Sequence, residues 1–125
     1  MGTEIGMRGV ASMVVCDEDT AVSMGSGDVY VLATPRLIAL CEQAACAALN
    51  GHLKPGCTTV GMRVQLDHLH PTAVGCTVAA EAVLDKIEGR RLTFTVSASD
   101  TKGLVAAGKV TRVLVDVEQF LDRVH

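Results

Sequence analysis

Aromatic side chains are scarce in this 125-residue chain, which has two Phe, one Tyr and no Trp. Single-stranded nucleic acids bind proteins largely by stacking their bases on aromatic rings, and duplexes bind strongly basic surfaces. A basic surface is missing as well, because the formal net charge is −3. We therefore predict no nucleic-acid partner.

Long apolar runs and paired-cysteine motifs are also missing. No apolar stretch reaches the roughly 18 residues that a membrane span requires, and no charged segment followed by an apolar one opens the chain. The five cysteines are odd in number and form no C-x-x-C motif, which is typical of reduced thiols used as small core residues. We predict a soluble, cytoplasmic protein that makes no contact with membranes.

The length of the chain allows one hydrophobic core and no more. With 49% hydrophobic residues and so few aromatics, that core must be built from Val, Leu and Ala. We expect a single domain spanning residues 1–125.

The most informative segment is a helical run, Leu37–Leu49, that is apolar almost all the way round and yet contains one carboxylate, Glu42. This pattern is typical of a helix surrounded by protein. Thr34 and Pro35 predict an N-cap and the first helical position, and Asn50-Gly51 predicts the end. A buried carboxylate must be paired, hydrogen-bonded or raised in pKa, which are also the conditions of catalytic carboxylates.

Five strands are predicted around this helix, separated after the helix by turns too short for anything but hairpins. They are expected at Gly9–Val15, Thr58–His70, Thr77–Ile87, Arg91–Ser99 and Leu104–Asp116. The strand Arg91–Ser99 alternates apolar and polar residues, so the sheet should have one dry face that needs a cover. The fold class is therefore predicted as α+β, with a curved antiparallel sheet wrapped around a long central helix.

The connection Cys16–Ala33 is rich in acidic residues and Gly. Eighteen residues without regular structure are unusual in a small domain unless they form a lid or a binding loop. We expect such a role for this segment.

His68 is the first candidate for chemistry. In the strand Thr58–His70 the even positions share one face by the period of two, so His68 should point to the helix that carries Glu42. A carboxylate and an imidazole together can orient and activate a hydroxyl or a water. The alternative is a core histidine hydrogen-bonded to a core glutamate, with no catalytic role.

Thr34 also has two interpretations. It is either a simple N-cap or a hydroxyl at the positive end of a helix, where the helix dipole and free amides stabilise a developing oxyanion. Eight residues separate Thr34 from Glu42, which is about 12 Å of helix rise. A triad therefore needs His68 between them, or an arrangement across a dimer.

Two further positions are candidates for the same site. Gly61 in mid-strand indicates a bulge or a close backbone approach, or else a backbone N–H that donates to a substrate oxygen. Arg112 is either a strand-end charge in solvent or the partner of a buried carboxylate. His68 and His70 share a face in this prediction, but no third ligand stands at a recognisable spacing, so we predict no metal site.

These residues, with several runs around them, resemble the hotdog-fold thioesterases and, within them, the fluoroacetyl-CoA thioesterase-like group. The matching segments are Thr34 and Glu42, Gly61–Val64 leading to His68, Pro71–Gly75, Glu88–Leu92, Val96–Asp100, and Arg112. The resemblance implies that Thr34, Glu42 and His68 are catalytic. It also implies that Gly61 stabilises an oxyanion and that Arg112 lies near the active site.

The activity implied by the resemblance is hydrolysis of a short-chain acyl-CoA to the acid and free CoA, without a cofactor, in a homodimer whose sites lie where two subunits meet. The alternatives are a hotdog dimer that only binds acyl-CoA or a small acid, and a hotdog dehydratase. One departure concerns substrate choice. The lid of that group looks aromatic and excludes water, whereas residues 16–33 are rich in Gly and Asp, so we expect little selection for a fluorinated acyl group.

Overall fold

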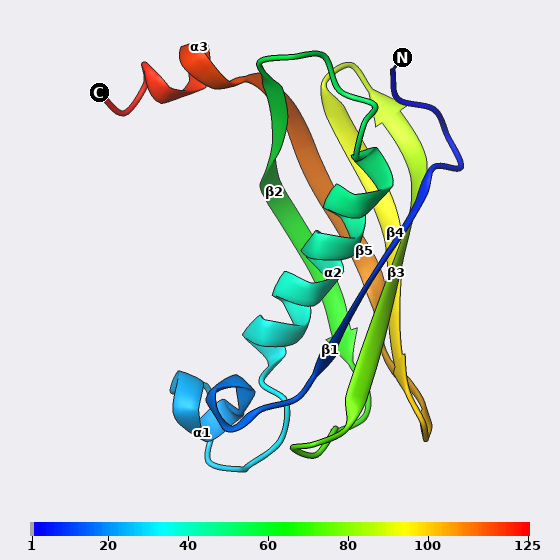
Figure 1. Cartoon of the computed structure of the whole chain (residues 1–125), viewed down its shortest axis with the longest axis vertical. Helices are drawn as coiled ribbons and strands as arrows, with labels where there is room; N and C mark the ends of the chain where they lie inside the picture. Colours follow the sequence, from blue (N-terminus) through cyan, green and yellow to red (C-terminus); the bar gives the residue numbers. More distant parts are fainter. Residues whose placement is uncertain (1) are drawn as a thin grey trace.

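The computed structural model describes residues 2–125, in which one antiparallel sheet curls around one long helix (Figure 1). The strands are β1 (Arg8–Val14), β2 (Cys57–His68), β3 (Thr77–Glu88), β4 (Arg91–Asp100) and β5 (Gly103–Asp116). The helices are the short η1 (Asp17–Asp19) and α1 (Ala21–Met24), the long α2 (Thr34–Leu49) and the terminal α3 (Val117–Leu121). The strand order is β1-β3-β4-β5-β2, so β1 and β2 are the edges. The predicted fold class is confirmed.

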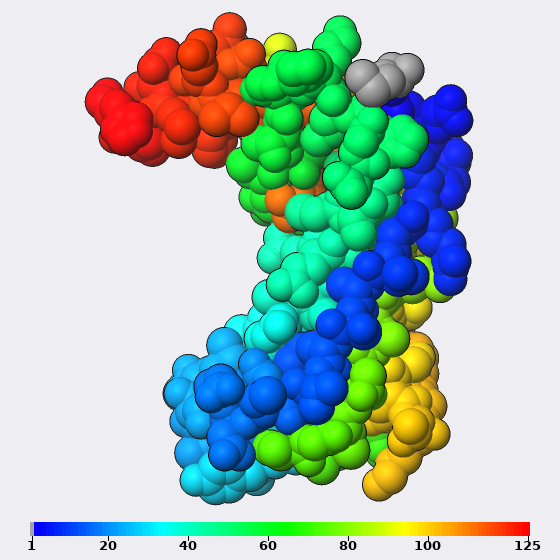
Figure 2. All heavy atoms as spheres, viewed as in Figure 1, coloured from blue at the N-terminus to red at the C-terminus, as the bar shows by residue number. Residues whose placement is uncertain are grey.

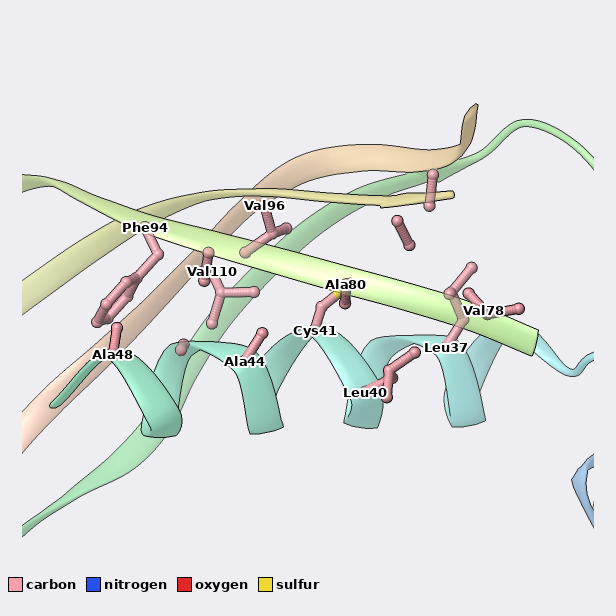
Figure 3. Packing of buried hydrophobic residues seen from close by; sticks show 14 of the residues in the cluster. Leu37, Leu40, Cys41, Ala44, Ala48, Val78, Ala80, Phe94, Val96 and Val110 are labelled. Atoms are coloured by element: carbon pink, nitrogen blue, oxygen red, sulfur yellow. The ribbon is translucent and has the colours of Figure 1, made fainter. Parts of the chain in front are cut away.

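The core lies between α2 and the concave face of the sheet (Figure 3). The helix side of this core consists of Leu37, Leu40, Cys41, Ala44 and Ala48, and the strand side includes Val78, Ala80, Phe94, Val96 and Val110. Small residues let the backbones approach closely. A Cβ added at Gly9 of β1 would lie 2.2 Å from the backbone of both Ala44 and Ala48, so only glycine fits where β1 crosses the helix.

The prediction that α2 is surrounded by protein is wrong for the single chain. Gln43, Cys46 and Ala47 are exposed, and Ile38 and Ala39 are half-buried. These residues form a face of the helix that the sheet does not cover and that is apolar apart from Gln43. Cys41, by contrast, is buried. The pKa of its thiol is raised to about 11, mainly by burial and to a smaller extent by the nearby Glu42.

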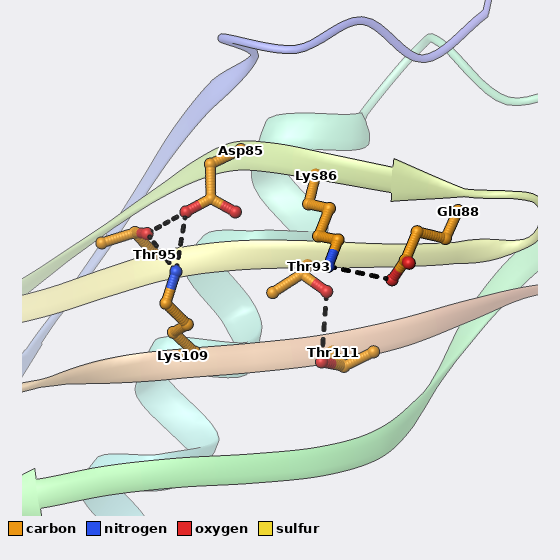
Figure 4. A network of polar contacts seen from close by, with 7 residues as sticks. All are labelled: Asp85, Lys86, Glu88, Thr93, Thr95, Lys109 and Thr111. Atoms are coloured by element: carbon orange, nitrogen blue, oxygen red, sulfur yellow. Dashed lines mark hydrogen bonds and ion pairs between the residues drawn. The ribbon is translucent and has the colours of Figure 1, made fainter.

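The convex face of the sheet is polar (Figure 4). Asp85 accepts hydrogen bonds from Thr95 and Lys109, which lower the pKa of its carboxyl group, and Thr93 and Thr111 meet at 3.4 Å. On the opposite face of β4, the alternate residues Leu92, Phe94, Val96 and Ala98 are all buried. The predicted division into a dry face and a polar face is therefore confirmed.

The predicted strands are all present, with ends that differ by one or two residues. The clearest difference is at His70, which lies outside β2 because the amides of Leu69 and His70 both bond to the carbonyl of Val105, at 2.7 and 3.3 Å. His68 and His70 therefore do not share a strand face. No helix among residues 2–125 is long and apolar enough to cross a membrane.

A β-bulge between Gly61 and Arg63 changes the face that β2 turns to the helix. Before the bulge the odd positions Thr59 and Gly61 face α2, and after it Val64, Leu66 and His68 are the more buried positions. The prediction that every even position shares one face is therefore wrong for the first half of β2. The prediction holds for His68 because the extra residue at the bulge turns the even positions of β2 toward the helix in the second half of the strand.

Candidate active site

Thr34 and His68 are in direct contact at the start of α2. The Thr34 Oγ1 lies 2.8 Å from the Nδ1 of His68. The N-cap of α2 is Ala33, whose carbonyl accepts the amide of Leu37 at 3.0 Å, and Thr34 is the first helical residue. The prediction of Thr34 as the N-cap is wrong, and its hydroxyl is turned to the histidine instead of to the helix backbone.

The surroundings of His68 favour the neutral imidazole. Burial lowers the pKa of His68, and the backbone of His70, which acts as an acceptor toward the ring, opposes this in part. The Nε2 is buried and has no hydrogen-bond partner among the described residues. A neutral ring whose Nδ1 faces a hydroxyl can accept the proton of that hydroxyl.

The Thr34–His68 pair opens into a cavity of about 270 Å³. Its lining consists of Val31, Thr34, His68, Leu69, His70 and Pro71. Three of these six residues are apolar, and Thr34 is exposed, so a small apolar group can enter beside the hydroxyl. The geometry suits an attack on a group bound in this cavity.

Glu42 lies in a second cluster, with Arg112 on β5. The Glu42 Oε2 accepts from Nη1 of Arg112 at 2.9 Å, and the same guanidinium donates to the hydroxyl and the carbonyl of Thr59, both at 2.9 Å. The Arg112 residue is 8% exposed, whereas the Glu42 side chain is 32% exposed. Of the two interpretations of Arg112, the partner of a carboxylate is confirmed.

The contact between Glu42 and His68 that the sequence predicted is not formed within the described chain. The hydrogen bonds of the two residues go to different partners, Arg112 and Thr34. The reason is the length of the helix, since Glu42 follows Thr34 by more than two turns. The single chain therefore presents two clusters, one at each of these positions.

Gly61 belongs to the Glu42 cluster. A Cβ added at Gly61 would lie 2.6 Å from Oε2 of Glu42 and 3.6 Å from Nη1 of Arg112. Both structural expectations for this glycine, a bulge and a close approach, are confirmed. The carboxylate can lie against the strand backbone only because no side chain stands there.

We call residues 16–33 the lid segment, because they lie beside the Thr34–His68 cavity. They contain η1 and α1, and an isolated bridge between Val31 and Ala73 joins them to the body. Asp19 is the main anchor, since its carboxylate accepts from Arg36 Nε at 3.2 Å and from the Cys16 amide at 2.8 Å.

Sequence reasoning missed the role of Arg36. A cation in the first turn of a helix faces the positive end of the helix dipole and therefore needs a carboxylate partner. The acidic run Asp17–Asp19 was the available signal.

A curled antiparallel sheet around one helix, with a hydroxyl and an imidazole paired at the start of that helix, places this protein among the hotdog-fold thioesterases. Solved structures agree. The fluoroacetyl-CoA thioesterase FlK superposes with a TM-score of 0.92 at 29% identity, covering 99% of this chain and 96% of that one. A thioesterase superfamily member from Thermus thermophilus does so with 0.87 at 25% identity, covering 97% and 92%.

Sequence comparison narrows the class to one family. The family model of fluoroacetyl-CoA-specific thioesterases matches residues 15–118. The fluoroacetyl-CoA thioesterase of Streptantibioticus cattleyicolor is 34% identical over 95 residues, which are 76% of this chain and 68% of that protein. The chain belongs to the fluoroacetyl-CoA-specific thioesterase family.

Proposed function

We propose that this protein hydrolyses a short-chain acyl-CoA to the acid and free CoA, with Thr34, Glu42 and His68 as its catalytic residues. The observation that carries the proposal is the 2.8 Å contact of Thr34 with His68 at the mouth of an open cavity. The relatives support the substrate class, since one solved FlK variant holds acetyl-CoA and another holds fluoroacetate and CoA.

In the proposed reaction the neutral His68 accepts the proton of the attacking hydroxyl, which belongs to Thr34 or to a water that Thr34 positions. Attack on the thioester carbonyl carbon moves negative charge to its oxygen, which accepts a hydrogen bond from the Gly61 N–H. The C–S bond then breaks, and the imidazolium returns its proton to the leaving thiolate. With water as the nucleophile this step gives the acid directly. With Thr34 as the nucleophile it gives an acyl-threonine ester, which a water activated by the neutral His68 then attacks, so that the C–O bond to Thr34 breaks, Thr34 regains its proton and the acid is released. Arg112 holds the Glu42 carboxylate in position through the contact at 2.9 Å.

The proposed reaction needs the Thr34–His68 pair close to Glu42 and Gly61, and a homodimer can bring these residues together across the two chains. The edge strand β2 is unpaired on one side and contains both Gly61 and His68. Antiparallel pairing of β2 with the β2 of a second copy moves the partner's Gly61 and Glu42 toward the Thr34–His68 pair. The uncovered apolar face of α2, which includes Ile38, Cys46 and Ala47, favours the same association.

Oligomeric state tests this part of the proposal. Light scattering should give twice the mass of the chain, or a larger even multiple, at concentrations at which the protein is active. A stable and fully active monomer would contradict the dimeric site.

The activity is tested by a thiol-release assay over a panel of acyl-CoA thioesters, with the Glu42→Gln variant as the control. Steady release of CoA by the unmodified protein, and its loss in the variant, is the expected result. Saturable binding without turnover would instead show a binding protein. Hydration of an enoyl-CoA without any free thiol would show a dehydratase.

A further inference from the structure

The last residues of the chain form an arm that stands away from the body. Asp116 ends β5 and caps α3 by accepting the amide of Gln119 at 3.1 Å. Figures 1 and 2 show that α3 and the residues after it project sideways from one end of the molecule. We call residues 117–125 the C-terminal arm. Leu121 is 43% exposed and Val124 is 72% exposed, so the apolar side chains of the arm lack a cover within the described chain.

The lid segment has the same property at the opposite end of the molecule. Val29 is 59% exposed and Tyr30, the only tyrosine, is 67% exposed. The lid segment and the C-terminal arm project to the same side of the molecule and leave a hollow between them, in which α2 and β2 are visible (Figure 2). Two apolar surfaces therefore flank one open side.

Both surfaces are tied to β2, at its two ends. Cys57, at the start of β2, pairs with Asp116, and the amide of Val117 bonds to the carbonyl of Gly56 at 2.9 Å. At the other end His68 contacts Thr34, directly after the lid segment. A two-fold axis that pairs β2 with its symmetry mate in antiparallel fashion exchanges these ends, so the start of one strand lies beside the end of the other.

The arm carries exposed charges of both signs, Glu118, Asp122 and Arg123, so apolar contact and not net charge favours this exchange. The lid segment contains Asp17, Glu18 and Asp28, which are exposed and take part in no ion pair among the described residues. In the arm, the guanidinium of Arg123 lies 5.9 Å above the ring of Phe120 and is likewise exposed. Arg123 lines one small cavity beside the arm together with Arg90 and Asp116. Within the arm, Arg123 is the only Lys or Arg that could face the acidic residues of the lid segment.

We propose that in the dimer the C-terminal arm of each chain packs on the lid segment of the other and completes the wall of the partner's active site. The inference rests on the proposed homodimer, and it names the second copy of this chain as the occupant of the lid surface. Leu121 and Val124 cover the partner's Val29 and Tyr30, and Arg123 faces the partner's acidic residues. The lid of each site is thereby held closed in part by the other chain.

A tryptophan reporter tests the contact without any enzymatic assay. The chain has no Trp, so the emission of a Tyr30→Trp variant reports on the lid alone. Adding Leu121→Asp and Val124→Asp should shift this emission to longer wavelength while light scattering still shows a dimer. The matched control, Val10→Asp, alters an equally exposed residue on the other edge strand and should leave the emission unchanged. Unchanged emission in the arm variant, or a monomeric unmodified protein, would overturn the proposal.

Mixed dimers then show which chain the arm serves. One mixture pairs a His68→Ala protomer with a protomer that carries Leu121→Asp and Val124→Asp, so that the only working site faces an unmodified arm from its partner. The KM of this dimer should equal that of the unmodified protein. The other mixture places all three substitutions in one protomer, so that the working site of the unmodified protomer faces an altered arm, and its KM should rise several-fold. The opposite pattern, or equal KM values in the two mixtures, would overturn the proposal even though the thioesterase activity itself remained.

Discussion

The two clusters of the candidate site differ in what surrounds their reactive atoms. The Thr34–His68 pair opens into a cavity, and burial lowers the pKa of its histidine, so its groups are neutral and free to exchange a proton. In the Glu42–Arg112 pair, three hydrogen bonds of the guanidinium hold the side chains in place. The first pair is therefore suited to moving protons, and the second is suited to holding charge in one position.

This difference shows how one helix can serve two purposes along its length. The first turn of α2 faces the end of β2, where the strand stops and leaves room for a ligand. The middle of α2 faces the bulge, where the strand backbone meets the carboxylate directly. Changes at the first cluster should therefore act on proton transfer, and changes at the second should act through the position of Glu42.

The largest expected effect is the loss of hydrolysis when either cluster loses its central group. His68→Ala and Glu42→Gln should each lower kcat/KM by roughly 10²- to 10⁴-fold, the range for an acid, base or orienting group. The control is His70→Ala, which alters another histidine of the same cavity, outside β2, and should cost much less. Equal, small losses at His68 and His70 would remove the Thr34–His68 pair from the mechanism.

The Gly61→Ala variant should show that the position of Glu42 affects activity separately from the stability of the fold. Gly61→Ala forces the Glu42 carboxylate away from Arg112, because the new Cβ would stand 2.6 Å from Oε2. Activity should fall by about tenfold or more, the scale of a misplaced catalytic group. Stability should fall little, since the end of a flexible side chain can move.

Gly9→Ala serves as the comparison for this variant. Its Cβ would meet the backbone of α2 at 2.2 Å, and overpacking of this kind lowers the free energy of unfolding by about 1–3 kcal/mol or more. Thermal unfolding measured beside activity would show the contrast. A Gly61→Ala protein with full activity would show that the position of Glu42 is not critical.

The pH dependence should reflect the first cluster. The pKa of His68 lies below its ordinary value of 6.5 in the folded protein, so the acid limb of kcat/KM should lie below pH 6.5. Between the folded and the unfolded pKa the unfolded chain binds more protons, so stability should decrease as the pH falls through 6.5. In His68→Gln this part of the decrease should disappear. An acid limb above pH 6.5 would contradict a buried, neutral His68.

The smallest expected effect concerns fluorine. Discrimination of a group smaller than a methylene provides about 1–3 kcal/mol at most unless water is excluded, and the centre of the lid segment is Gly25-Ser26-Gly27-Asp28. These four residues are exposed. The kcat/KM values for fluoroacetyl-CoA and acetyl-CoA should therefore differ by no more than their intrinsic reactivities toward hydroxide. A much larger preference for fluoroacetyl-CoA would show that the lid segment does exclude water.

Much of the fold was predictable because its signals are local. The apolar run of α2, the alternation of β4 and the short turns between strands each depend on residues near one another in sequence. The thioesterase class came from the resemblance to the hotdog-fold thioesterases, and the family match confirms it. The ends of strands were less predictable because tertiary bonds such as those to the Val105 carbonyl decide where pairing stops.

The candidate site divides in the same way. The sequence by itself determined which residues are candidates by their chemistry: Thr34, Glu42, Gly61, His68 and Arg112. Only the tertiary structure decided that Thr34 meets His68, 34 residues away, and that Glu42 meets Arg112, 70 residues away. The physical reason is the bulge at Gly61. One extra residue in β2 changes which side chains face the helix. Gly61 indicates a bulge, but it does not specify which residues of the helix and of β5 meet across it.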